Sequence, residues 1–209
     1  MNLETMYWWF DKGVEKTFCD KIIKLGDSKT KQKGTLQDNK LNIETRKSDV
    51  VWLDEPWIYN ILKPLLDEPW IYEKVWEFVN VANINSKWNF DIDWCEKAQY
   101  TVYEKGQYYG WHMDQFAKPY IKSDPNHNGK IRKISLSLQL SNGDDYEGGD
   151  LEFCSDNMPG KDREFTSCSD ARNKGTLIFF PSFLFHRVKP VTKGIRKSLV
   201  VWFIGRPYK

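Results

Sequence analysis

The stretch KISLSLQLS, residues 133–141, decides the fold class of this chain. Ile134, Leu136, Leu138 and Leu140 alternate there with three serines and one glutamine. Because successive side chains of a β-strand point to opposite faces of its sheet, the alternation predicts a strand with one apolar and one polar face. We therefore expect a sheet around this stretch, with its apolar face packed on a core.

Short apolar runs separated by turn residues continue on both sides of this stretch. They are WNFDIDW (88–94), AQYTVYEKGQYYGWHMD (98–114), DLEFC (150–154), GTLIFFPS (175–182), FLFHRVKPV (183–191) and RKSLVVWFIG (196–205). Gly106 marks a turn inside the second run, and NGDDYEGGD (142–150) is a cluster of turn residues. Many short strands with turns between them are typical of a β-sandwich or barrel.

Helical spacing dominates the N-terminal part of the chain. In GVEKTFCDKIIKLG (13–26) apolar residues recur at the helical period, and Gly26 is expected to end the helix. EKVWEFVNVAN (73–83) predicts a second amphipathic helix. Helices followed by strands predict an α+β fold, with the helices packed on one side of a β core.

The heptapeptide LDEPWIY occurs twice, at residues 53–59 and 66–72. The step between the copies would turn a straight helix by about 220°, so the copies cannot share one helix face. Proline is favoured in the first turn of a helix. Each copy is therefore expected to begin a short helix, at Pro56 and at Pro69.

The length and composition are those of a globular domain. The chain has 209 residues, of which 40% are hydrophobic and 15% aromatic, enough for a sizeable core. We expect one domain over residues 1–209, with helical support and loops in 1–87 and the β core with the functional site in 88–209. The Asn- and Lys-rich composition hints at an AT-rich genome, viral or bacterial.

Charge and cysteine content exclude several classes of protein. The formal net charge of +2 gives no strong sign of a general attraction to nucleic acid or to an anionic membrane. No two of the four cysteines form a C-x-x-C pair, which argues against a zinc knuckle. The first residues lack the pattern of a signal peptide, and no apolar stretch approaches a membrane span. A cytoplasmic protein is expected.

Candidate metal ligands lie close together in YYGWHMD (108–114). His112 and Asp114 stand two residues apart, a spacing that places both on one face of a strand. His186, in a strand-like run late in the chain, is the natural third ligand. Two histidines and one carboxylate form the facial triad of non-haem Fe(II) oxygenases. His127 lies in a polar run and is expected to be a solvated loop residue, not a ligand.

Further features strengthen this interpretation, since an isolated His-x-Asp is common. Tyr103, Gly106 and Tyr109 precede the pair in the pattern Tyr-x-x-Gly-x-x-Tyr-x-x-His-x-Asp. The segment YEGGDLEF (146–153) stands between the two metal-binding segments, and Arg196 follows the distal histidine by ten residues.

With these motifs the chain resembles the Fe(II)- and 2-oxoglutarate-dependent oxygenases over roughly residues 98–204. It is most similar to their prolyl 4-hydroxylase-like group, and especially to the bacterial PKHD-type hydroxylases. The resemblance implies a double-stranded β-helix, the jelly roll of the cupins, with N-terminal supporting helices. It also implies Fe(II), the co-substrates 2-oxoglutarate and O2, and ascorbate as a further cofactor.

The resemblance assigns roles by position. The implied iron ligands are His112, Asp114 and His186. Arg196 would bind the C5 carboxylate of 2-oxoglutarate, a group that a guanidinium fork holds well. Tyr103 would help through its phenol, and Ser198 could add a hydroxyl donor on the same side of the strand as Arg196.

The implied reaction hydroxylates a C–H bond and converts 2-oxoglutarate to succinate and CO2. The expected substrate is a prolyl residue of a protein or peptide. Aromatic residues near the first metal-binding segment, such as Trp111 and Phe116, are expected mainly to pack in the core or at the barrel mouth, and the alternative is an aromatic wall for the peptide. Two alternatives stay open: the same chemistry on a free amino acid or other small molecule, and a non-catalytic cupin-like binding module. Nucleic-acid demethylation is disfavoured, because Arg196 and Arg206 lack the spacing typical of that group.

Two geometric expectations concern the strands of the site. A three-residue turn, 192–194, is expected to join the strands of His186 and Arg196 as a hairpin, with Gly194 at positive φ and His186 opposite Val200. The second expectation is regular alternation before His112. It would put Tyr108 and Gly110 on the ligand side, and Tyr109 and Trp111 on the other face.

Two polar segments, 115–130 and 154–173, are rich in Gly, Pro, Ser and Asp. We expect them to form loops at the mouth of the site, where they could act as lids.

Overall fold

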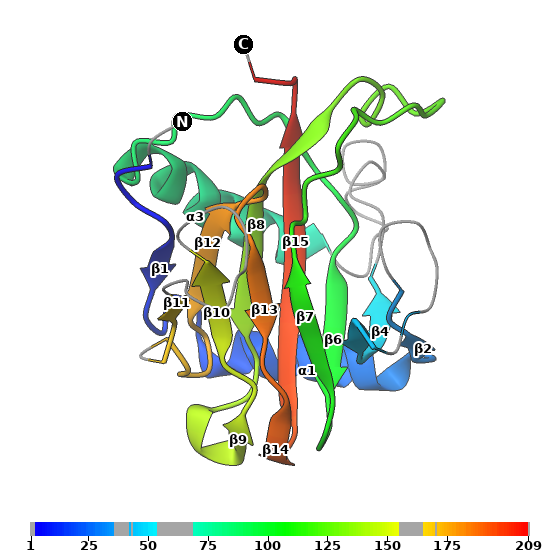
Figure 1. The fold of residues 1–209 in the computed structure, drawn as a ribbon, viewed down its shortest axis with the longest axis vertical. Coiled ribbons are helices and arrows are strands. Elements are labelled where there is room, and N and C mark those ends of the chain that lie inside the picture. Colours follow the sequence, from blue (N-terminus) through cyan, green and yellow to red (C-terminus); the bar gives the residue numbers. More distant parts are fainter. Residues whose placement is uncertain are drawn as a thin grey trace.

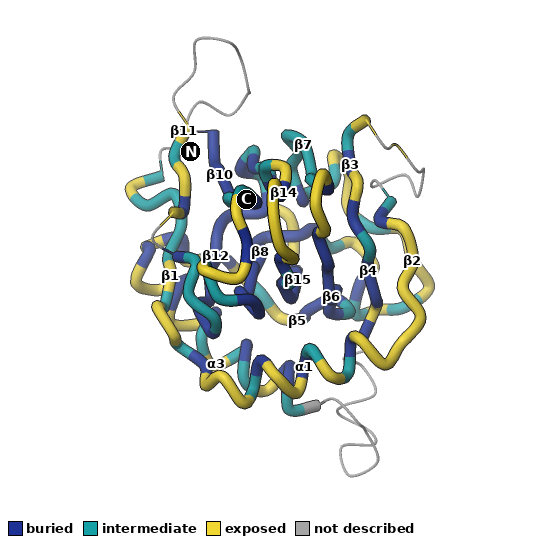
Figure 2. Tube along the Cα trace, turned by 90° about the horizontal axis from the view of Figure 1, so that it is seen from below, coloured by how far each residue is buried: buried dark blue, intermediate teal, exposed yellow. Residues whose placement is uncertain are grey.

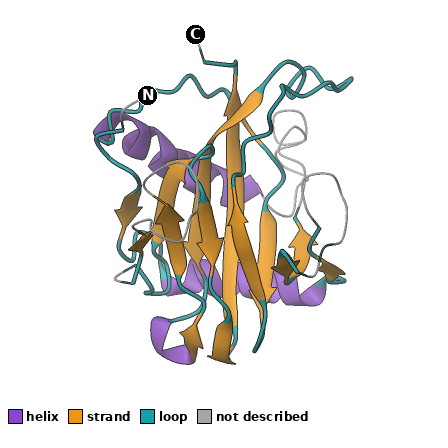
Figure 3. Cartoon of the chain, in the orientation of Figure 1, coloured by secondary structure: helices purple, strands orange, loops and turns teal. Residues whose placement is uncertain are grey.

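The computed structural model describes residues 3–35, 42, 44–53, 69–154, 165–169 and 171–208. Two antiparallel sheets lie face to face, and helices α1 (Lys16–Ser28) and α3 (Pro69–Asn85) cover the outer face of the larger sheet (Figures 1 and 2). The two helices lie behind the strands in the view of Figure 3. The expected α+β fold with a jelly-roll core and supporting helices is confirmed.

The larger sheet has eight strands among the described residues. Seven of them form one path, in the order β1 (Trp8–Phe10), β12 (Leu177–Pro181), β8 (Ile131–Gln139), β15 (Arg196–Gly205), β6 (Gln99–Tyr103), β4 (Asp49–Trp52) and β2 (Gln32–Lys33). The eighth strand, β5 (Trp94–Cys95), pairs with β15 beside this path.

The smaller sheet has five strands in the part of the chain that is described. Their order is β11 (Phe165–Ser167), β10 (Leu151–Cys154), β13 (His186–Val188), β7 (Tyr108–His112) and β3 (Arg46–Lys47). A short 3-10 helix, η3 (Gly143–Asp145), leads into a separate ribbon of β9 (Tyr146–Gly148) and β14 (Val191–Gly194).

Strand β8 carries the stretch that predicts the fold, and both of its faces are buried. Leu136 and Leu138 belong to the apolar core between the larger sheet and the helices. Ser135 and Ser137 on the opposite face are buried as well. Ser137 lines a cavity, and Ser135 bonds to Asp114 beside that cavity. The polar face of β8 is therefore turned to a polar space inside the molecule, not to solvent.

Helix α1 confirms the prediction for residues 13–26 but ends two residues later, at Ser28. Gly26 lies inside the helix, where a Cβ atom would collide with the ring of Tyr100 in β6. The close approach of helix and sheet requires glycine at this position. Helix α3 spans Pro69–Asn85 and buries Val75 and Val79. The second LDEPWIY copy thus does not form a short helix of its own, because its helical residues continue without a break into the helix expected over 73–83. The expected helix start at Pro56 lies outside the described residues.

The strand expected over residues 88–94 is wrong except at its end, where β5 begins at Trp94. Lys87 and Asn89 have φ values of 56° and 50°, in the left-handed region that an extended strand cannot contain. Trp88 and Phe90 are nevertheless buried, with their rings stacked at 6.2 Å. The alternation therefore reports burial here, but not strand conformation.

The hairpin expected between His186 and Arg196 is also wrong. Residues 191–194 form β14, which pairs with β9, and the chain crosses there from the smaller sheet to the larger one. His186 pairs with His112 in one sheet, and Arg196 pairs with Tyr103 in the other. Gly194 does have the expected positive φ, 72°. The two residues thus face one another across the jelly roll and are not neighbours in a hairpin.

None of the helices in the described ranges is long and apolar enough to cross a membrane.

Candidate active site

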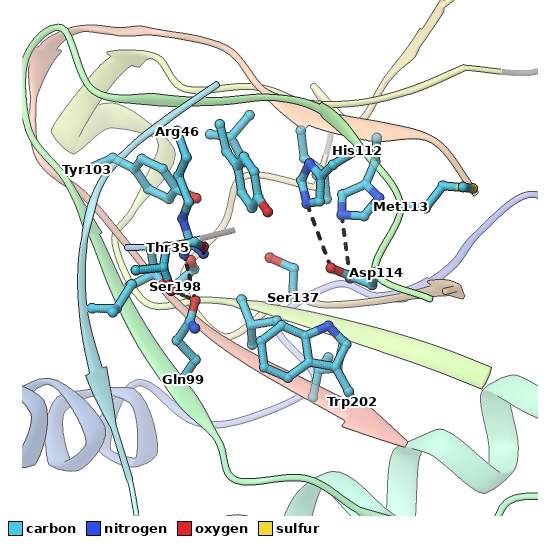
Figure 4. A pocket seen from close by; sticks show the side chains of 18 of the residues that line it. Thr35, Arg46, Gln99, Tyr103, His112, Met113, Asp114, Ser137, Ser198 and Trp202 are labelled. Carbon is cyan, nitrogen blue, oxygen red and sulfur yellow. Dashed lines mark hydrogen bonds and ion pairs between the residues drawn. The ribbon is translucent and has the colours of Figure 1, made fainter. Parts of the chain in front are cut away.

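The three candidate metal ligands meet at one point between the sheets. His112 ends β7 and lies directly opposite His186 of β13, and Asp114 follows two residues later. Their ligand atoms all lie within 4.8 Å of one another. Nε2 of His112 is 3.7 Å from Oδ1 of Asp114, and Nε2 of His186 is 3.5 Å from Oδ2 (Figure 4).

Backbone carbonyls orient both imidazole rings. Nδ1 of His112 lies 2.8 Å from the Gly110 carbonyl, and Nδ1 of His186 lies 2.9 Å from the Leu184 carbonyl. A carbonyl oxygen only accepts, so each Nδ1 carries the proton and each Nε2 keeps a lone pair. These lone pairs are directed at the Asp114 carboxylate.

The carboxylate of Asp114 is held from β8 and from the end of β12. Ser135 donates to Oδ2 at 2.7 Å, and the hydroxyls of Ser135 and Ser182 lie 2.9 Å apart. The backbone N–H of Asp114 donates to the Ser182 carbonyl at 2.9 Å. Outer partners of this kind fix the orientation of metal ligands. Ser135 comes from the polar face of the strand that predicts the fold.

The electrostatics of this cluster favour a bound cation. Burial, together with the neighbouring His186, lowers the pKa of His112 to about 3, so its ring is neutral at physiological pH. Burial raises the pKa of Asp114, but the two histidines, Arg132 and the Ser135 hydroxyl lower it below its ordinary value. The neutral His112 ring and the Asp114 carboxylate thus present a lone pair and a negative charge to the same point. This donor set fits Fe(II) as found in the facial triads of oxygenases.

A β-bulge changes which aromatic residues reach the ligands. His112 pairs with His186 but Tyr109 pairs with Val188, so β7 has one residue more than β13 between these pairs. A bulge of this kind shifts the side-chain alternation by one residue. Tyr109 therefore stacks on His112, with ring centroids 3.5 Å apart.

The expectation from regular alternation is thus wrong for Tyr109, and also for Tyr108. The Tyr108 hydroxyl donates to the carbonyl of Glu44, away from the cavity. Trp111 faces away, as expected, against Phe165 and the Arg187 guanidinium. It is therefore not a wall of the site.

Arg196 approaches the same space from the larger sheet. Its side chain is only 1% exposed, and Nη1 donates to Oγ of Ser198 at 3.4 Å. Nε and Nη2 have no hydrogen-bond partner among the described residues. The guanidinium carbon lies 5.5 Å from the ring centre of Tyr103, the cross-strand neighbour of Arg196. A buried guanidinium with unused donors is costly unless an anion meets it.

The metal-ligand cluster and Arg196 share one cavity of about 190 Å³. Its walls include all six residues singled out in the sequence: His112, Asp114, His186, Arg196, Tyr103 and Ser198. Phe116, an aromatic residue singled out in the sequence, also lines the cavity. Other wall residues have no signal in the sequence, because they come from unrelated strands; these include Arg46, Gln99, Arg132 and Trp202.

A buried ion pair supports the wall near Asp114. Arg132 donates to both carboxylate oxygens of Glu96, at 2.8 and 2.6 Å, and to the Asp114 carbonyl at 3.3 Å. Its guanidinium carbon lies 3.9 Å from the ring centre of Trp202. The Tyr120 hydroxyl also donates to Glu96, which tethers the 115–130 loop to the sheet.

The expectation that His127, in the same loop, is solvated is wrong. Its side chain is buried, not solvated, and its Nδ1 contacts the Asp124 carboxylate. The only group of three possible metal ligands in the described ranges does not include it. Part of the second expected loop, 155–164 and 170, lies outside the described residues.

Replacing Glu96 by glutamine is expected to lower the free energy of unfolding by about 3–5 kcal/mol, because Arg132 loses its buried carboxylate. Burial raises the pKa of Glu96, but Arg132, the Tyr120 hydroxyl and His127 together lower it by more, so the folded-state pKa lies below the ordinary value. The ionised Glu96 side chain thus contributes its full stabilisation above its unfolded-state pKa. This stabilisation is lost as pH falls through the lowered folded-state pKa. Urea unfolding at neutral and acidic pH measures both effects.

Glu147→Gln is the matched control. Glu147 pairs with Lys193 at 2.9 Å, but both side chains are well exposed, so its loss should be much smaller. Equal losses in the two variants would show that the Glu96 pair contributes no more than a surface pair.

Comparison with known proteins places this site in a family context. The model of the 2OG-Fe(II) oxygenase superfamily matches residues 98–204. A PKHD-type hydroxylase of Idiomarina loihiensis is 36% identical over 100 residues, which cover 48% of this chain and 38% of that protein. A PKHD-type hydroxylase of Teredinibacter turnerae is 34% identical over 104 residues, covering 50% and 41%. The matched region thus spans about two fifths of the length of these relatives.

Solved structures agree in fold over nearly the whole chain. A Pseudomonas putida prolyl-4-hydroxylase superposes with a TM-score of 0.65 at 18% identity, covering 98% of this chain and 95% of that chain. A viral collagen prolyl hydroxylase from Paramecium bursaria Chlorella virus-1 superposes with a TM-score of 0.60 at 21% identity, covering 97% of each. At these identities the likeness shows a shared fold.

Proposed function

Because the chain belongs to the 2OG-Fe(II) oxygenase superfamily, we propose that it is an Fe(II)- and 2-oxoglutarate-dependent hydroxylase. The proposed reaction takes a C–H bond, 2-oxoglutarate and O2 to an alcohol, succinate and CO2. One oxygen atom of O2 enters the alcohol and the other enters succinate. Fe(II), when bound, would supply the oxygen activation that couples these two oxidations.

In this proposal the residues of the cavity divide between two tasks. Nε2 of His112, Nε2 of His186 and the Asp114 carboxylate hold the metal, with both rings fixed by their Nδ1 bonds. Arg196 holds the distal carboxylate of 2-oxoglutarate, and Ser198 lies beside its guanidinium. Burial raises the pKa of Tyr103, so its phenol stays protonated and can donate to the co-substrate.

The observation that carries the proposal is the unsatisfied Arg196 guanidinium in the cavity of the metal ligands. A metal site alone would not require a buried cation near it, since like charges repel. A dianionic co-substrate that bridges the two groups accounts for both. A non-catalytic binding module would need neither the metal-ligand cluster nor the buried Arg196 guanidinium.

The substrate class is the finer part of the proposal. We propose a prolyl residue in a protein or peptide, as the names of similar proteins suggest: a structure with a TM-score of 0.65 is a Trichoplax adhaerens prolyl hydroxylase bound to a peptide fragment. Phe116 and Trp202 on the cavity wall provide aromatic surface that suits an apolar ring. Dependence on ascorbate stays a prediction of the sequence resemblance.

The test is anaerobic titration of the metal-free protein with Fe(II) and then 2-oxoglutarate. A weak visible charge-transfer band is expected only when both are present, because the metal and the co-substrate must occupy the cavity together. Succinate should then form on admission of air. A native protein that gives neither band nor succinate would refute the proposal.

A further inference from the structure

Arg46 is a further buried cation on the cavity wall, besides Arg196 and Arg132, and the proposed reaction does not use it. It lies on β3, at the edge of the smaller sheet, and is 7% exposed. Figure 4 shows it beside Tyr103 and above Thr35, on the far side of the cavity from Met113. Its position differs from that of Arg196, which lies on a strand of the larger sheet.

The three hydrogen bonds that Arg46 makes to described residues all go to neutral acceptors. Nε donates to Oγ of Ser48 at 2.9 Å, Nη1 to the Thr35 carbonyl at 3.0 Å and Nη2 to Oε1 of Gln99 at 2.7 Å. No carboxylate of the described residues lies within ion-pair distance of it. These bonds aim the guanidinium and leave part of its donor set unused.

The other cations of the cavity wall are balanced. Arg132 pairs with Glu96, and Lys33 on β2 pairs with Asp49 at 2.6 Å. Fe(II), the Asp114 carboxylate, the 2-oxoglutarate dianion and the Arg196 guanidinium would together be neutral. Within the described ranges, Arg46 is then the wall cation that has no carboxylate partner, in a largely desolvated space where an unpaired charge is costly.

Arg46 is also within reach of the reacting position. Its guanidinium carbon lies 4.5 Å from the ring centre of Tyr109, and this ring stacks directly on His112. The indole N–H of Trp202, across the cavity, is buried and has no partner among the described residues. Both groups offer donors, so the molecule that fills this part of the cavity has to bring acceptors.

We propose that Arg46 binds a carboxylate of the substrate, so that the residue to be hydroxylated is flanked by an acidic group. The inference rests on the proposed function and narrows its substrate class to anionic peptides. A guanidinium fork that is already oriented is well suited to a carboxylate. The carboxylate is either an acidic side chain next to the proline or a free C-terminus.

The experiment uses sets of short proline peptides that differ by one carboxylate. One set carries Asp or Asn at each position around the proline, with both ends blocked, and another has a free or an amidated C-terminus. Tryptophan fluorescence follows binding to the anaerobic Fe(II)–2-oxoglutarate complex, and mass spectrometry detects the gain of one oxygen atom in air.

The wild type should bind the preferred carboxylate peptide roughly tenfold or more tightly than its neutral twin, as charge-assisted hydrogen bonds allow. Arg46→Gln should lose most of this ratio. Arg46→Lys should keep part of it, because the charge remains without the fork. The ratio is taken within one variant, so a partial loss of folded protein cancels. Lys33→Gln, which removes a cation already balanced by Asp49, should keep the ratio.

The outcomes separate the two proposals. If the wild type forms the complex and hydroxylates charged and neutral peptides alike, the role of Arg46 is overturned and the proposed function stands. If Arg46→Gln keeps the ratio but weakens 2-oxoglutarate binding without peptide, Arg46 belongs to the co-substrate site and the inference is again wrong. If neither complex nor product forms, both proposals fail.

Discussion

His112→Ala is expected to lower succinate formation by more than roughly a hundredfold, since loss of even an outer partner of a metal ligand costs 10–100-fold. The variant should still fold, because the backbone pairing of β7 with β13 does not depend on this ring. Liquid chromatography with mass spectrometry quantifies succinate. The rise in Tm on adding Fe(II) under anaerobic conditions reports metal binding independently of turnover.

The matched control is His127→Ala, which removes a histidine that contacts an aspartate outside the metal-ligand cluster. His127 pairs with Asp124 in the loop at 115–130 and lies outside the cavity wall. This variant should keep both succinate formation and the metal-dependent rise in Tm. If His112→Ala also kept both, the assignment of His112, Asp114 and His186 as the metal site would be wrong.

The parts of the fold that the sequence predicts depend on local periodicity. The alternation in 133–141 and the helical spacing in 13–26 and 73–83 each correspond to an element of the structure. Alternation does not reveal what the polar face meets, however. Ser135 resembles a solvent-facing residue in the sequence, yet it is buried and holds the Asp114 carboxylate.

The errors come from register and from connections between sheets. One bulged residue in β7 places Tyr109 against His112, and no local property of the sequence marks that residue. The crossing at 191–194 has the length and the glycine of a hairpin turn, but β9 is available to pair with it. Its pairing therefore depends on a strand about 45 residues away, which no turn rule includes.

The sequence predicts those residues of the site that belong to a motif with fixed spacing, and it does not predict the others. His112, Asp114, His186 and Arg196 were predicted because their spacing matches a family pattern, and the structure brings them to one cavity. Arg46 had no such spacing. It reaches the cavity only because β3 pairs with β7, a contact between segments more than sixty residues apart.

Arg196→Met is expected to change stability and co-substrate binding in opposite directions. In the protein without 2-oxoglutarate, Nε and Nη2 of Arg196 have no partner among the described residues. Replacing such a group by an apolar side chain of similar length should raise the free energy of unfolding, by about 1–4 kcal/mol if it behaves like other buried charges. Removing the same guanidinium should weaken 2-oxoglutarate binding by about 2–5 kcal/mol, as for a truncated buried charge pair.

Urea unfolding of the metal-free protein and anaerobic calorimetry with 2-oxoglutarate test the two signs separately. Ser198→Ala is the matched control, because Ser198 shares the environment of Arg196 but contributes only a hydroxyl at 3.4 Å. Its effects on stability and on 2-oxoglutarate binding should both be clearly smaller than those of Arg196→Met, because it removes at most one neutral donor. A variant Arg196→Met that is less stable than the wild type and binds 2-oxoglutarate equally well would mean that Arg196 is a structural residue. A guanidinium without a partner destabilises the protein that lacks 2-oxoglutarate, but the same guanidinium stabilises the complex. A variant that gains stability and loses 2-oxoglutarate affinity would therefore show that Arg196 serves ligand binding and not the fold.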